Sequence, residues 1–341
     1  MKISAIRTVI ISRTDAIGDV VLTLPMAALI KEILGKDVRV IFFGKTYTYP
    51  VIKCCDAIDE FLNYDTFIKL DNKGRMNFLK ECNADAIIHV YPRKDISSAA
   101  KNADIRERIG TTNRYYHWLS CNRLVKLGRK NSDLHESQLN AILLKPFGYK
   151  NILPLEKVPS LYRMTNVEDL RNKYSILILK DKFKLVIHPH SHSSGREWKL
   201  SYYADLIRYL SPAKFQIFIT GGEKESATIN EWAKTLPTHV LNLAGLMTLD
   251  DMVAFLNSCD GIVAASTGPL HIAAALGKHA LGIYPPIRPL HPVRWSPVGI
   301  KAEYIVANKE CSTCRNNPAN CTCISDISPA MVEERIMKWV K

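Results

Sequence analysis

Short apolar runs alternate with helix-like stretches along most of this 341-residue chain. A strand pattern followed by helical periodicity is typical of βαβ units, which pair their strands in parallel and place helices on the faces of the sheet. The alternation is interrupted over 149–175, where periodicity is poor and prolines occur, and it then resumes. We therefore predict an α/β protein with two mostly parallel domains. The predicted strands cover 8–12, 38–43, 59–64 and 86–91 before the interruption, and 184–188, 215–220, 240–243, 261–265 and 280–284 after it.

We place the N-terminal domain at 1–165, the linker within 149–175 and the C-terminal domain at 176–327. The last stretch, 328–341, has helical periodicity with apolar residues on one side, so it needs a surface to pack on. One candidate for that surface is the N-terminal domain.

The composition is that of a soluble globular protein, with 47% hydrophobic and 23% charged residues. No apolar stretch is long enough to cross a bilayer, and the first residues lead into a strand pattern without the features of a signal peptide. Nine cysteines, an odd number, then indicate mostly reduced thiols. We therefore expect a cytosolic protein.

The formal net charge of +13 calls for an acidic partner: nucleic acid, an anionic membrane surface or acidic small molecules. Much of the positive charge is concentrated over 93–130, together with aromatic residues. A solvated surface is the ordinary explanation of scattered charges, but this clustering favours a surface that faces an anion. The basic residues are Arg93, Lys94, Lys101, Arg106, Arg108, Arg114, Arg123, Lys126, Arg129 and Lys130, interleaved with Tyr115, Tyr116 and Trp118.

One strand–turn–helix pattern has the form of a phosphate-binding site. The apolar run 261–265 is followed by Ser266, Thr267 and Gly268, then by Pro269 and an alanine-rich helix. Proline suits the first position of a helix because the N–H there has no partner in the helix. Unpaired N–H groups and the positive end of the helix dipole would meet at one point, which suits a phosphate. The alternative is an ordinary βα turn with a well-capped helix.

Asp19 follows the first predicted strand and lies at the start of a helix predicted over 20–34. As an N-cap it would stabilise the helix by about 1 kcal/mol. Alternatively, it is a carboxylate displayed at the carboxyl end of a parallel strand, where open α/β sheets place their chemistry. Ligand loops on the facing edges of two such domains would leave a cleft, a common place for a ligand.

Three segments carry a family resemblance. They are Ile17-Gly18-Asp19-Val20-Val21-Leu22-Thr23-Leu24-Pro25, His188-Pro189 followed by Arg196-Glu197-Trp198, and Ser266-Thr267-Gly268-Pro269-Leu270-His271. Weaker similarities are Arg108-Ile109-Gly110, Thr220-Gly221-Gly222 and Ile327-Ser328-Pro329. In this order, over nearly the whole chain, they resemble glycosyltransferase family 9, the bacterial lipopolysaccharide heptosyltransferases.

The resemblance implies a GT-B architecture, in which two Rossmann-like α/β domains face each other across a cleft. It also implies an inverting, metal-independent sugar transfer that requires no cofactor. The donor is then a nucleotide sugar, typically ADP-heptose. The acceptor is the inner core of a lipopolysaccharide precursor, a lipid-linked molecule whose Kdo sugars and phosphates are acidic. The protein would be cytoplasmic and peripheral to the inner face of the inner membrane, with transient membrane contact and no nucleic-acid partner.

The resemblance also implies roles for single residues. Asp19 corresponds in position to the catalytic base. Arg196 stands where the family usually has a phosphate-contacting lysine, and a guanidinium can hold diphosphate oxygens bidentately. Glu225 corresponds to the residue that contacts ribose, and Met247 and Thr248 to part of the adenine pocket. The full donor-side set is Gly18, Glu225, Met247, Thr248, Ser266, Thr267, Gly268, Pro269 and His271, and the acceptor-side candidates are Arg106, Arg108, Arg114 and Arg123.

Two departures from the family pattern concern the donor site. Ser266 stands where the family commonly has an aspartate that contacts the transferred sugar, and a hydroxyl forms weaker hydrogen bonds with sugar hydroxyls than a carboxylate does. The identity of the donor sugar is therefore open. His190 and His192 replace glycines after His188, and the three histidines alternate as residues on one face of a strand would. Packing and hydrogen bonding explain them better than a metal site, because no fourth ligand is placed.

The tail contains Cys311, Cys314, Cys321 and Cys323, in a C-x2-C-x6-C-x-C pattern. Such a set can bind zinc tetrahedrally, and an iron–sulfur cluster is also conceivable. A structural thiol cluster or a disulfide is the other explanation. We assign no metal ligands from this pattern.

Two other functions remain open at this point. Another GT-B nucleotide-sugar enzyme, a different transferase or an epimerase, would use the same turns. A non-enzymatic alternative is a basic nucleic-acid-binding protein whose segment 93–130 follows a nucleic-acid backbone. Against it, no known nucleic-acid-binding module occurs, and the phosphate-type turns lie outside the basic segment.

Overall fold

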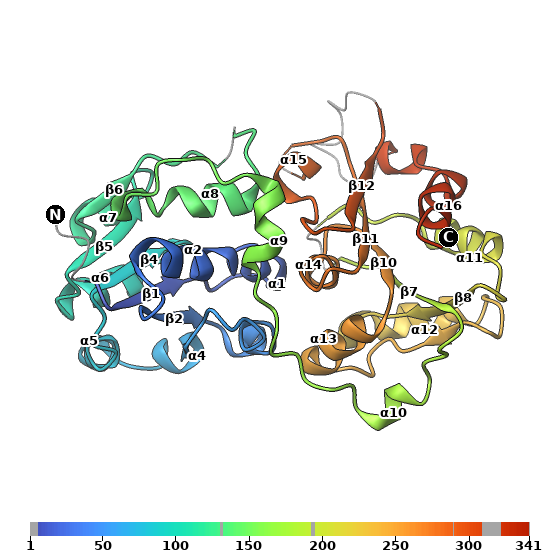
Figure 1. The fold of residues 1–341 in the computed structure, drawn as a ribbon, viewed down its shortest axis with the longest axis horizontal. Coiled ribbons are helices and arrows are strands. Elements are labelled where there is room, and N and C mark those ends of the chain that lie inside the picture. The colour runs from blue at the N-terminus through green and yellow to red at the C-terminus, as the bar shows by residue number, and fades with distance from the viewer. Residues whose placement is uncertain (1–5, 130–131, 192–194, 289, 309–321, 341) are drawn as a thin grey trace. The chain divides into compact units, whose positions relative to one another are not determined.

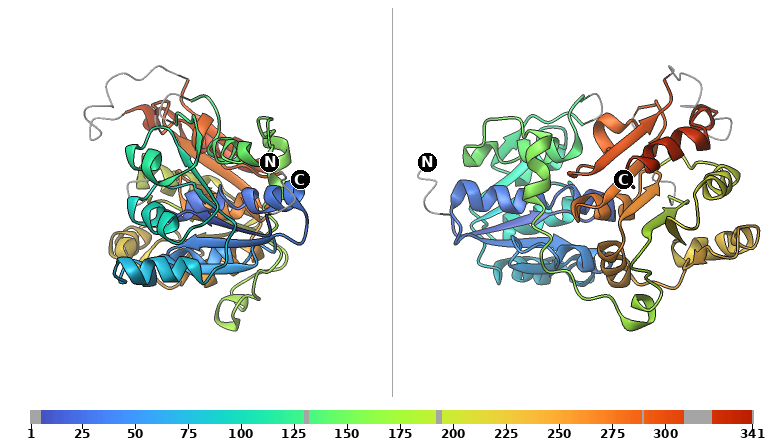
Figure 2. Two further views of the ribbon diagram at one scale, coloured as in Figure 1. Left: turned by 90° about the vertical axis from the view of Figure 1, so that its left-hand side faces the viewer. Right: turned by 45° about the vertical axis from the view of Figure 1, so that its right-hand side comes forward.

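The computed structural model describes residues 6–129, 132–191, 195–288, 290–308 and 322–340. The chain divides into two compact units, Met1–Asn166 and Val167–Lys341. Each unit is built on a six-stranded parallel sheet with helices on both faces (Figure 1; Figure 2). The predicted fold class, α/β with two mostly parallel sheets, is therefore confirmed.

In the first unit the strand order is β3-β2-β1-β4-β5-β6. β1 pairs with β2 on one side and with β4 on the other, so the order of the chain through the sheet reverses between β1 and β4. The strands are β1 (Thr8–Ser12), β2 (Arg39–Gly44), β3 (Glu60–Asn63), β4 (Ala86–His89), β5 (Glu107–Thr111) and β6 (Arg123–Val125). The helices are α1 (Ile17–Val21), α2 (Pro25–Leu34), α3 (Tyr49–Ile52), α4 (Tyr64–Phe67), α5 (Asn72–Lys80), α6 (Lys94–Asn102), α7 (Tyr115–Ser120), α8 (Glu136–Ile142) and α9 (Val158–Leu161).

The second unit repeats this topology with the order β12-β11-β10-β7-β8-β9, and the reversal falls between β7 and β10. Its strands are β7 (Phe183–His188), β8 (Phe215–Ile219), β9 (Leu241–Asn242), β10 (Gly261–Ala264), β11 (His279–Tyr284) and β12 (Ala302–Val306). Its helices are α10 (Asn172–Ser175), α11 (Leu200–Tyr209), α12 (Ser226–Ala233), α13 (Leu249–Ser258), α14 (Gly268–Ala275), α15 (Pro292–Trp295) and α16 (Pro329–Met337).

The central strands are completely buried because helices cover both faces of each sheet. All five residues of β1 and of β8 are buried, in keeping with their mostly apolar sequences. In the first unit Phe43 and Phe67 pack edge to face in the core, with 5.2 Å between ring centroids. Two well-packed sheets therefore support the loops that leave the carboxyl ends of their strands.

The single helix predicted over 20–34 is in fact two helices. α1 begins at Ile17, and α2 begins at Pro25 after an intervening turn. Proline separates the two because it lacks an N–H and restricts the residue before it. Ala16 is the N-cap of α1, so Asp19 lies within the first turn of that helix and is not its cap.

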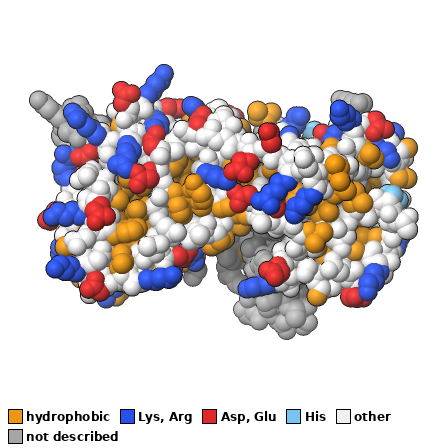
Figure 3. All heavy atoms as spheres, turned by 90° about the horizontal axis from the view of Figure 1, so that it is seen from below, with side chains coloured by type: hydrophobic (Ala, Val, Ile, Leu, Met, Phe, Trp, Pro, Cys, Tyr) orange, Lys and Arg blue, Asp and Glu red, His pale blue; other side chains and the backbone are white. Residues whose placement is uncertain are grey.

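Three strands that the sequence patterns did not reveal complete the sheets: β5, β6 and β12. β5 and β6 lie in the segment 93–130, where charged residues obscure the strand pattern. Glu107 and Arg108 begin β5, and Arg123 begins β6. This segment is therefore a succession of helices and strands and not one basic surface. On the face seen in Figure 3, Lys and Arg side chains are likewise interspersed with Asp and Glu.

The C-terminal helix α16 packs on the second unit itself. Val332 and Ile336 are buried in the core of that unit, and α16 lies beside α11 (Figure 2). Trp339, just beyond the helix, stacks on His279 with 4.9 Å between ring centroids. The apolar side of α16 is thus buried within the second unit, which supplies the surface that its helical pattern requires.

Some residues singled out in the sequence lie outside the described residues: Lys130, His192, Cys311, Cys314 and Cys321. The metal and thiol-cluster hypotheses for the tail therefore stay hypotheses. The described cysteines are free thiols, and they are Cys54, Cys55, Cys82, Cys121, Cys259 and Cys323. Among the helices of the described ranges, none is long and apolar enough to pass through a membrane.

Candidate active site

The residues predicted to act in chemistry collect at one place in each sheet. Where the strand order of a doubly wound sheet reverses, the loops at the carboxyl ends leave in opposite directions and open a crevice for a ligand. In the first unit, the loop after β1 leads to Gly18 and Asp19. In the second unit, the loop after β7 carries Arg196, and the turn after β10 carries Ser266 and Thr267. We call these two places the β1/β4 and the β7/β10 switch points.

Asp19 belongs to a buried network of charges around Arg13. The Arg13 side chain is only 3% exposed and donates hydrogen bonds to Asp19, to Asp15 Oδ1 at 2.7 Å and to Glu136 Oε1 at 3.0 Å. Arg13 directly follows β1, and its backbone N–H donates to Phe43 O on β2 at 3.0 Å. The sheet thus fixes the guanidinium, and the guanidinium in turn fixes the carboxylate of Asp19.

Helix α8 supplies the second layer of this network. Glu136 and Asn140 are four residues apart, so they lie on one face of the helix, and both are fully buried. Arg129 donates hydrogen bonds to both of them, at 3.1 Å to Asn140 Oδ1. Asn140 Nδ2 donates to Leu22 O, just after α1, at 3.1 Å. The helix that carries Asp19 is therefore tied to α8 through buried polar groups.

The environment of Asp19 favours its protonated form more than water does. Burial raises the pKa of Asp19 to about 6, with the carboxylates of Asp15 and Glu136 acting in the same direction and Arg13 opposing them. Burial alone would lower the pKa of Arg13, but the three carboxylates raise it above its usual range. At neutral pH Asp19 is mostly ionised, and its pKa is close enough to 7 for efficient proton transfer. The site can therefore supply a general base.

Sequence analysis identified Asp19 but missed the groups that hold it. One signal was available for α8, because Glu136 and Asn140 are polar residues four apart, although Ser137 and Gln138 between them are also polar. Two polar residues on a buried helix face indicate a hydrogen-bonded pair. Arg13 gives no comparable signal, since an arginine after a strand is usually exposed.

Three of the four arginines predicted to face the acceptor lie at the sheet edge opposite to Asp19. Arg106 precedes β5, Arg108 is the second residue of β5, and Arg123 begins β6, so all three lie toward the amino ends of their strands. Arg106 and Arg123 form ion pairs with acidic residues of the same edge, and Arg108 Nε donates to Ser120 O at 2.7 Å. The clustering of these arginines in the sequence does not correspond to a cluster around Asp19.

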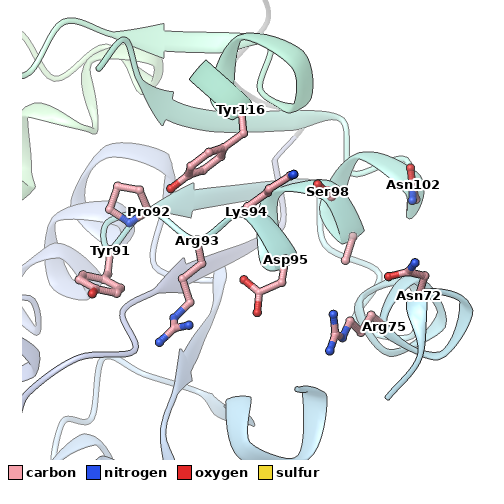
Figure 4. Close-up of a pocket in the computed structure, with 11 residues that line it drawn as sticks. Asn72, Arg75, Tyr91, Pro92, Arg93, Lys94, Asp95, Ser98, Asn102 and Tyr116 are labelled. Atoms are coloured by element: carbon pink, nitrogen blue, oxygen red, sulfur yellow. The ribbon is translucent and has the colours of Figure 1, made fainter. Parts of the chain in front are cut away.

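A cavity of 590 Å³ adjoins the β1/β4 switch point. It is lined by residues that follow β4 and by residues of α5, α6 and α7, and we call it the β4 cavity. Tyr116 borders it on one side and Arg75 on the other (Figure 4). Arg93, in its wall, donates from Nε to Thr14 Oγ1 at 2.8 Å. This bond connects the cavity to the loop that leads to Asp19.

The β4 cavity is positively charged. Arg75, Arg93 and Lys94 line it together with a single carboxylate, that of Asp95 (Figure 4). In the described part of the chain, Lys94 has no ion-pair partner. Arg114, the one predicted acceptor-side arginine that follows the carboxyl end of a strand, is exposed at the N-cap of α7. A cavity of this charge suits an anionic group.

In the second unit, the loop after β7 lies against the turn after β10. The register pairs His188 with Ala264, so the two strands end side by side. A Cβ added at Gly195 would come within 3.3 Å of Ser266 N, which shows how closely the backbones approach. Arg196 follows Gly195 and is half-buried. The structure thus brings together two segments that are about 70 residues apart in the sequence.

The residues around Arg196 hold this loop in place. Glu197 accepts a hydrogen bond from the backbone N–H of Ser191 at 2.7 Å, and its other oxygen is 2.9 Å from His190 Nδ1. Trp198 is buried and donates from Nε1 to Ile327 O at 2.8 Å. Glu197 and Trp198 therefore act as anchors on the C-terminal side of Arg196, which accounts for their place in the motif.

The turn after β10 has the features of an oxyanion site. Thr267 is the N-cap of α14, which begins at Gly268 with Pro269 in second position, one later than predicted. The first N–H groups of a helix have no partner within it. Thr267 Oγ1 is buried beside them, and no described residue forms a hydrogen bond with it. A bound oxyanion would accept hydrogen bonds from both kinds of donor. Ser266, the residue before Thr267 in this turn, forms a side-chain hydrogen bond with Tyr284.

The remaining donor-side residues lie along the same sheet edge. Glu225 follows β8, and its Oε2 accepts a hydrogen bond at 3.0 Å from the backbone at the start of its own turn. Thr248 is the N-cap of α13 and exchanges hydrogen bonds with Asp251, while Met247 directly precedes it. His271 is buried in α14. The hydroxyl of Thr248 is thus used in capping a helix, which the resemblance alone did not indicate.

The two described histidines of the predicted trio are engaged in hydrogen bonds. His188 Nδ1 lies 2.9 Å from Thr220 Oγ1, and His190 contacts Glu197. Within the described ranges, no group of three or more His, Cys, Asp or Glu side chains could hold a metal ion.

Comparison with known proteins gives the family. The model of glycosyltransferase family 9 (heptosyltransferase) matches residues 79–324. The chain belongs to this family. It is 25% identical over 300 residues to a presumed glycosyltransferase of Haemophilus influenzae, covering 85% of this chain and 86% of that one. It is 32% identical to lipopolysaccharide heptosyltransferase 2 of Escherichia coli over 99 residues, 28% of each chain.

The fold of this family 9 glycosyltransferase is similar to the solved structure of Escherichia coli ADP-heptose lipopolysaccharide heptosyltransferase II. The TM-score is 0.75 at 17% identity, and 98% of each chain is covered. The predicted family and the GT-B fold class are thus confirmed. The protein is a glycosyltransferase.

Proposed function

We propose that this enzyme transfers heptose from ADP-heptose to the inner core of a lipopolysaccharide precursor, inverting the anomeric carbon without a metal ion. The observation that carries the proposal is the buried charge network that presents Asp19 as an ionised carboxylate at a switch point. The similarity to a lipopolysaccharide heptosyltransferase and to the fold of one that uses ADP-heptose supports this choice of acceptor and donor.

In the proposed step an acceptor hydroxyl attacks the anomeric carbon of the donor sugar while Asp19 takes the hydroxyl proton. A bond forms between the acceptor oxygen and the anomeric carbon, and the bond from that carbon to the β-phosphate oxygen breaks. The electron pair leaves with ADP, whose diphosphate gains negative charge. Because attack and departure take place on opposite faces of the sugar, its configuration inverts.

The departing diphosphate is stabilised by fixed donors of the second unit. Arg196 offers a bidentate guanidinium, and the first N–H groups of α14 together with the Thr267 hydroxyl offer neutral donors. These groups would take the place that a divalent cation has in metal-dependent transferases. The proposal therefore requires no metal or cofactor.

Recognition of the donor follows the roles carried over from the family. Glu225 would contact the ribose, Met247 and Thr248 the adenine, and Ser266 the transferred sugar. Because Ser266 is neutral, the sugar hydroxyls would be held less strongly here than by an aspartate. The residues proposed to complete the donor site are Gly18, Gly268, Pro269 and His271.

We propose that acidic groups of the acceptor occupy the β4 cavity. Lys94 lines it and Arg114 lies on the same edge, whereas Arg106, Arg108 and Arg123 have no part in this proposal. The acceptor is lipid-linked, so the enzyme would work in the cytoplasm at the inner face of the inner membrane.

The purified protein with ADP-heptose and a Kdo-bearing lipid A acceptor tests the proposal. We expect release of ADP, a product heavier by one heptose, an inverted anomeric configuration by NMR, and no loss of rate in EDTA. An altered nucleotide sugar formed without any acceptor would instead identify an epimerase. Transfer from UDP-sugars but not from ADP-heptose would overturn the donor assignment.

A further inference from the structure

Helix α7 exposes large apolar side chains on one face. Tyr115 is 70% exposed, Trp118 62% and Leu119 71%. They are spaced three and four residues apart, so they share a face of the helix, which we call the α7 face. Trp118 Nε1 donates to Thr112 O at 2.9 Å, so the polar group of the indole is satisfied by the protein itself. Adjacent exposed apolar side chains of this size mark a contact surface.

Positive charge borders the α7 face. Arg114 is the N-cap of the helix, and Lys101 Nζ donates to Leu119 O at 3.0 Å. Arg114 and Lys126 are exposed and form no ion pair with any described residue. A partner that covers this surface must therefore combine an apolar layer with negative charge.

The surface of a bilayer with anionic lipids has both properties. Tryptophan and tyrosine rings favour the boundary between headgroups and acyl chains, and leucine favours the acyl chains. Lysine and arginine beside them are attracted to anionic headgroups. A protein partner would have to supply an apolar centre and an acidic rim of matching shape, whereas a bilayer with anionic lipids offers both over its whole surface. The observations thus favour a lipid surface.

The same helix also reaches the β4 cavity. Tyr116 lies between the residues of the α7 face in sequence, but its side chain borders the cavity with Lys94 (Figure 4). One six-residue helix therefore connects the proposed acceptor cavity with an exposed aromatic face.

We propose that Tyr115, Trp118 and Leu119 dock on a bilayer that contains anionic phospholipid and hold the β4 cavity at its surface. The role of this docking rests on the proposed function, because a lipid-linked acceptor would then be presented where the cavity opens. Docking itself requires neither donor nor acceptor, so it can be measured separately.

The first experiment uses the full chain and vesicles of phosphatidylethanolamine with phosphatidylglycerol, compared with vesicles of phosphatidylcholine alone. We expect co-sedimentation with the anionic vesicles that weakens at high salt. Bromine on the acyl chains should quench part of the tryptophan fluorescence. That quenching should be absent in Trp118→Phe, because the other four tryptophans lie elsewhere.

The decisive variant is Tyr115→Ser with Leu119→Ser, which changes exposed positions outside the β4 cavity. We expect affinity for the anionic vesicles to fall at least about tenfold, with unchanged Tm. Ile300→Ser is the matched control, since Ile300 is 82% exposed in the second unit, and it should bind vesicles normally. Transfer to a soluble, delipidated acceptor should be unchanged in both variants.

Equal binding of the double variant and the parent protein would overturn the proposal, as would binding to uncharged vesicles that salt does not weaken. A dimer in solution that the double variant dissociates would assign the α7 face to a second copy and also overturn it. If vesicle binding behaves as expected while no heptose is transferred, the proposed function fails and the docking surface stands.

Discussion

The two switch points of this protein present charge in different ways. At β1/β4 the functional group is a side chain, Asp19, held among other buried charges by Arg13. At β7/β10 one charged side chain, Arg196, accompanies neutral donors: the first N–H groups of α14 and the buried hydroxyl of Thr267. The topology around both sites is the same, so the difference lies in the loops.

This difference matches the two tasks that sugar transfer requires. A base must change its protonation state, so its environment has to set a pKa through burial, neighbouring charges and hydrogen bonds. A diphosphate stays anionic before and after the reaction, so a fixed positive charge and fixed dipoles can stabilise it throughout. If the comparison is right, variants at β1/β4 should change pH dependence and turnover. Variants at β7/β10 should mainly change nucleotide binding and stabilisation of the leaving group.

Asp19→Asn should have the largest effect. Asparagine has nearly the same shape but cannot take a proton, so we expect kcat to fall by about 10²–10⁴. Affinity for ADP, measured by calorimetry, should be unchanged because the proposed contacts to adenine, ribose and diphosphate all belong to the other unit.

Asp15→Asn is the matched control, because Asp15 also contacts Arg13 and its side chain has the same exposure as that of Asp19. It should keep near-normal turnover at pH 8. Near-normal turnover in Asp19→Asn would instead reduce Asp19 to an acidic residue in the first turn of α1, and the contrast between the two switch points would lose its basis.

Arg196→Ala should have the next largest effect. Loss of one charged donor to the leaving group is expected to lower kcat by about 10²–10³, and Arg196→Lys should restore most of it, since the family resemblance implies a lysine at this position. The pH profile should keep its shape in both variants. A shifted profile would mean that Arg196 acts on the base as well, contrary to the separation of roles.

The sequence was sufficient to predict the sheets and the loops that bear the functional residues, but not the residues that surround them. Continuous apolar strands, prolines and short motifs predicted both sheets and the loops that bear Asp19, Arg196 and Thr267. It was not sufficient for the partners of those residues, because Arg13 and Glu136 are more than 100 positions apart and meet only through the fold. The clustering of arginines over 93–130 gave a misleading prediction of the acceptor side for the same reason. Successive charges in a βα segment fall on opposite edges of the sheet, as the positions of Arg106 and Arg114 show.

The two edges of the first sheet can be compared directly with charge-removing variants. Lys94→Gln and Arg114→Gln, at the carboxyl edge, should each raise the acceptor KM up to about tenfold by removing a charged hydrogen bond. Arg106→Gln, at the amino edge, should leave it unchanged. The measurement is initial rate against acceptor concentration at saturating donor. A larger effect from Arg106→Gln than from the other two variants would assign the acceptor site to the amino edge of the sheet.

The pH dependence tests the network around Asp19. With a pKa of about 6, Asp19 becomes protonated as the pH falls through 6, so kcat/KM should decline there. Asp15→Asn removes a negative charge that raises this pKa, so the ionised base persists to lower pH. The ratio of kcat/KM at pH 5.5 to that at pH 8 should therefore rise by about two- to fourfold. An unchanged or falling ratio would contradict the assignment of the acid limb to Asp19.

Thr267→Val should have a small effect, with opposite signs for function and stability. Its hydroxyl is buried and forms no hydrogen bond with any described residue, so replacing it with a methyl group should raise the free energy of unfolding by about 1 kcal/mol. If the same hydroxyl donates to the diphosphate, the Kd for ADP should increase about fivefold. Thr248→Val provides the contrast, because that hydroxyl is already engaged in capping α13 and its loss should lower stability. A Thr267→Val protein that is less stable and binds ADP normally would show that the hydroxyl serves the fold and that the turn after β10 holds its anion through the backbone alone.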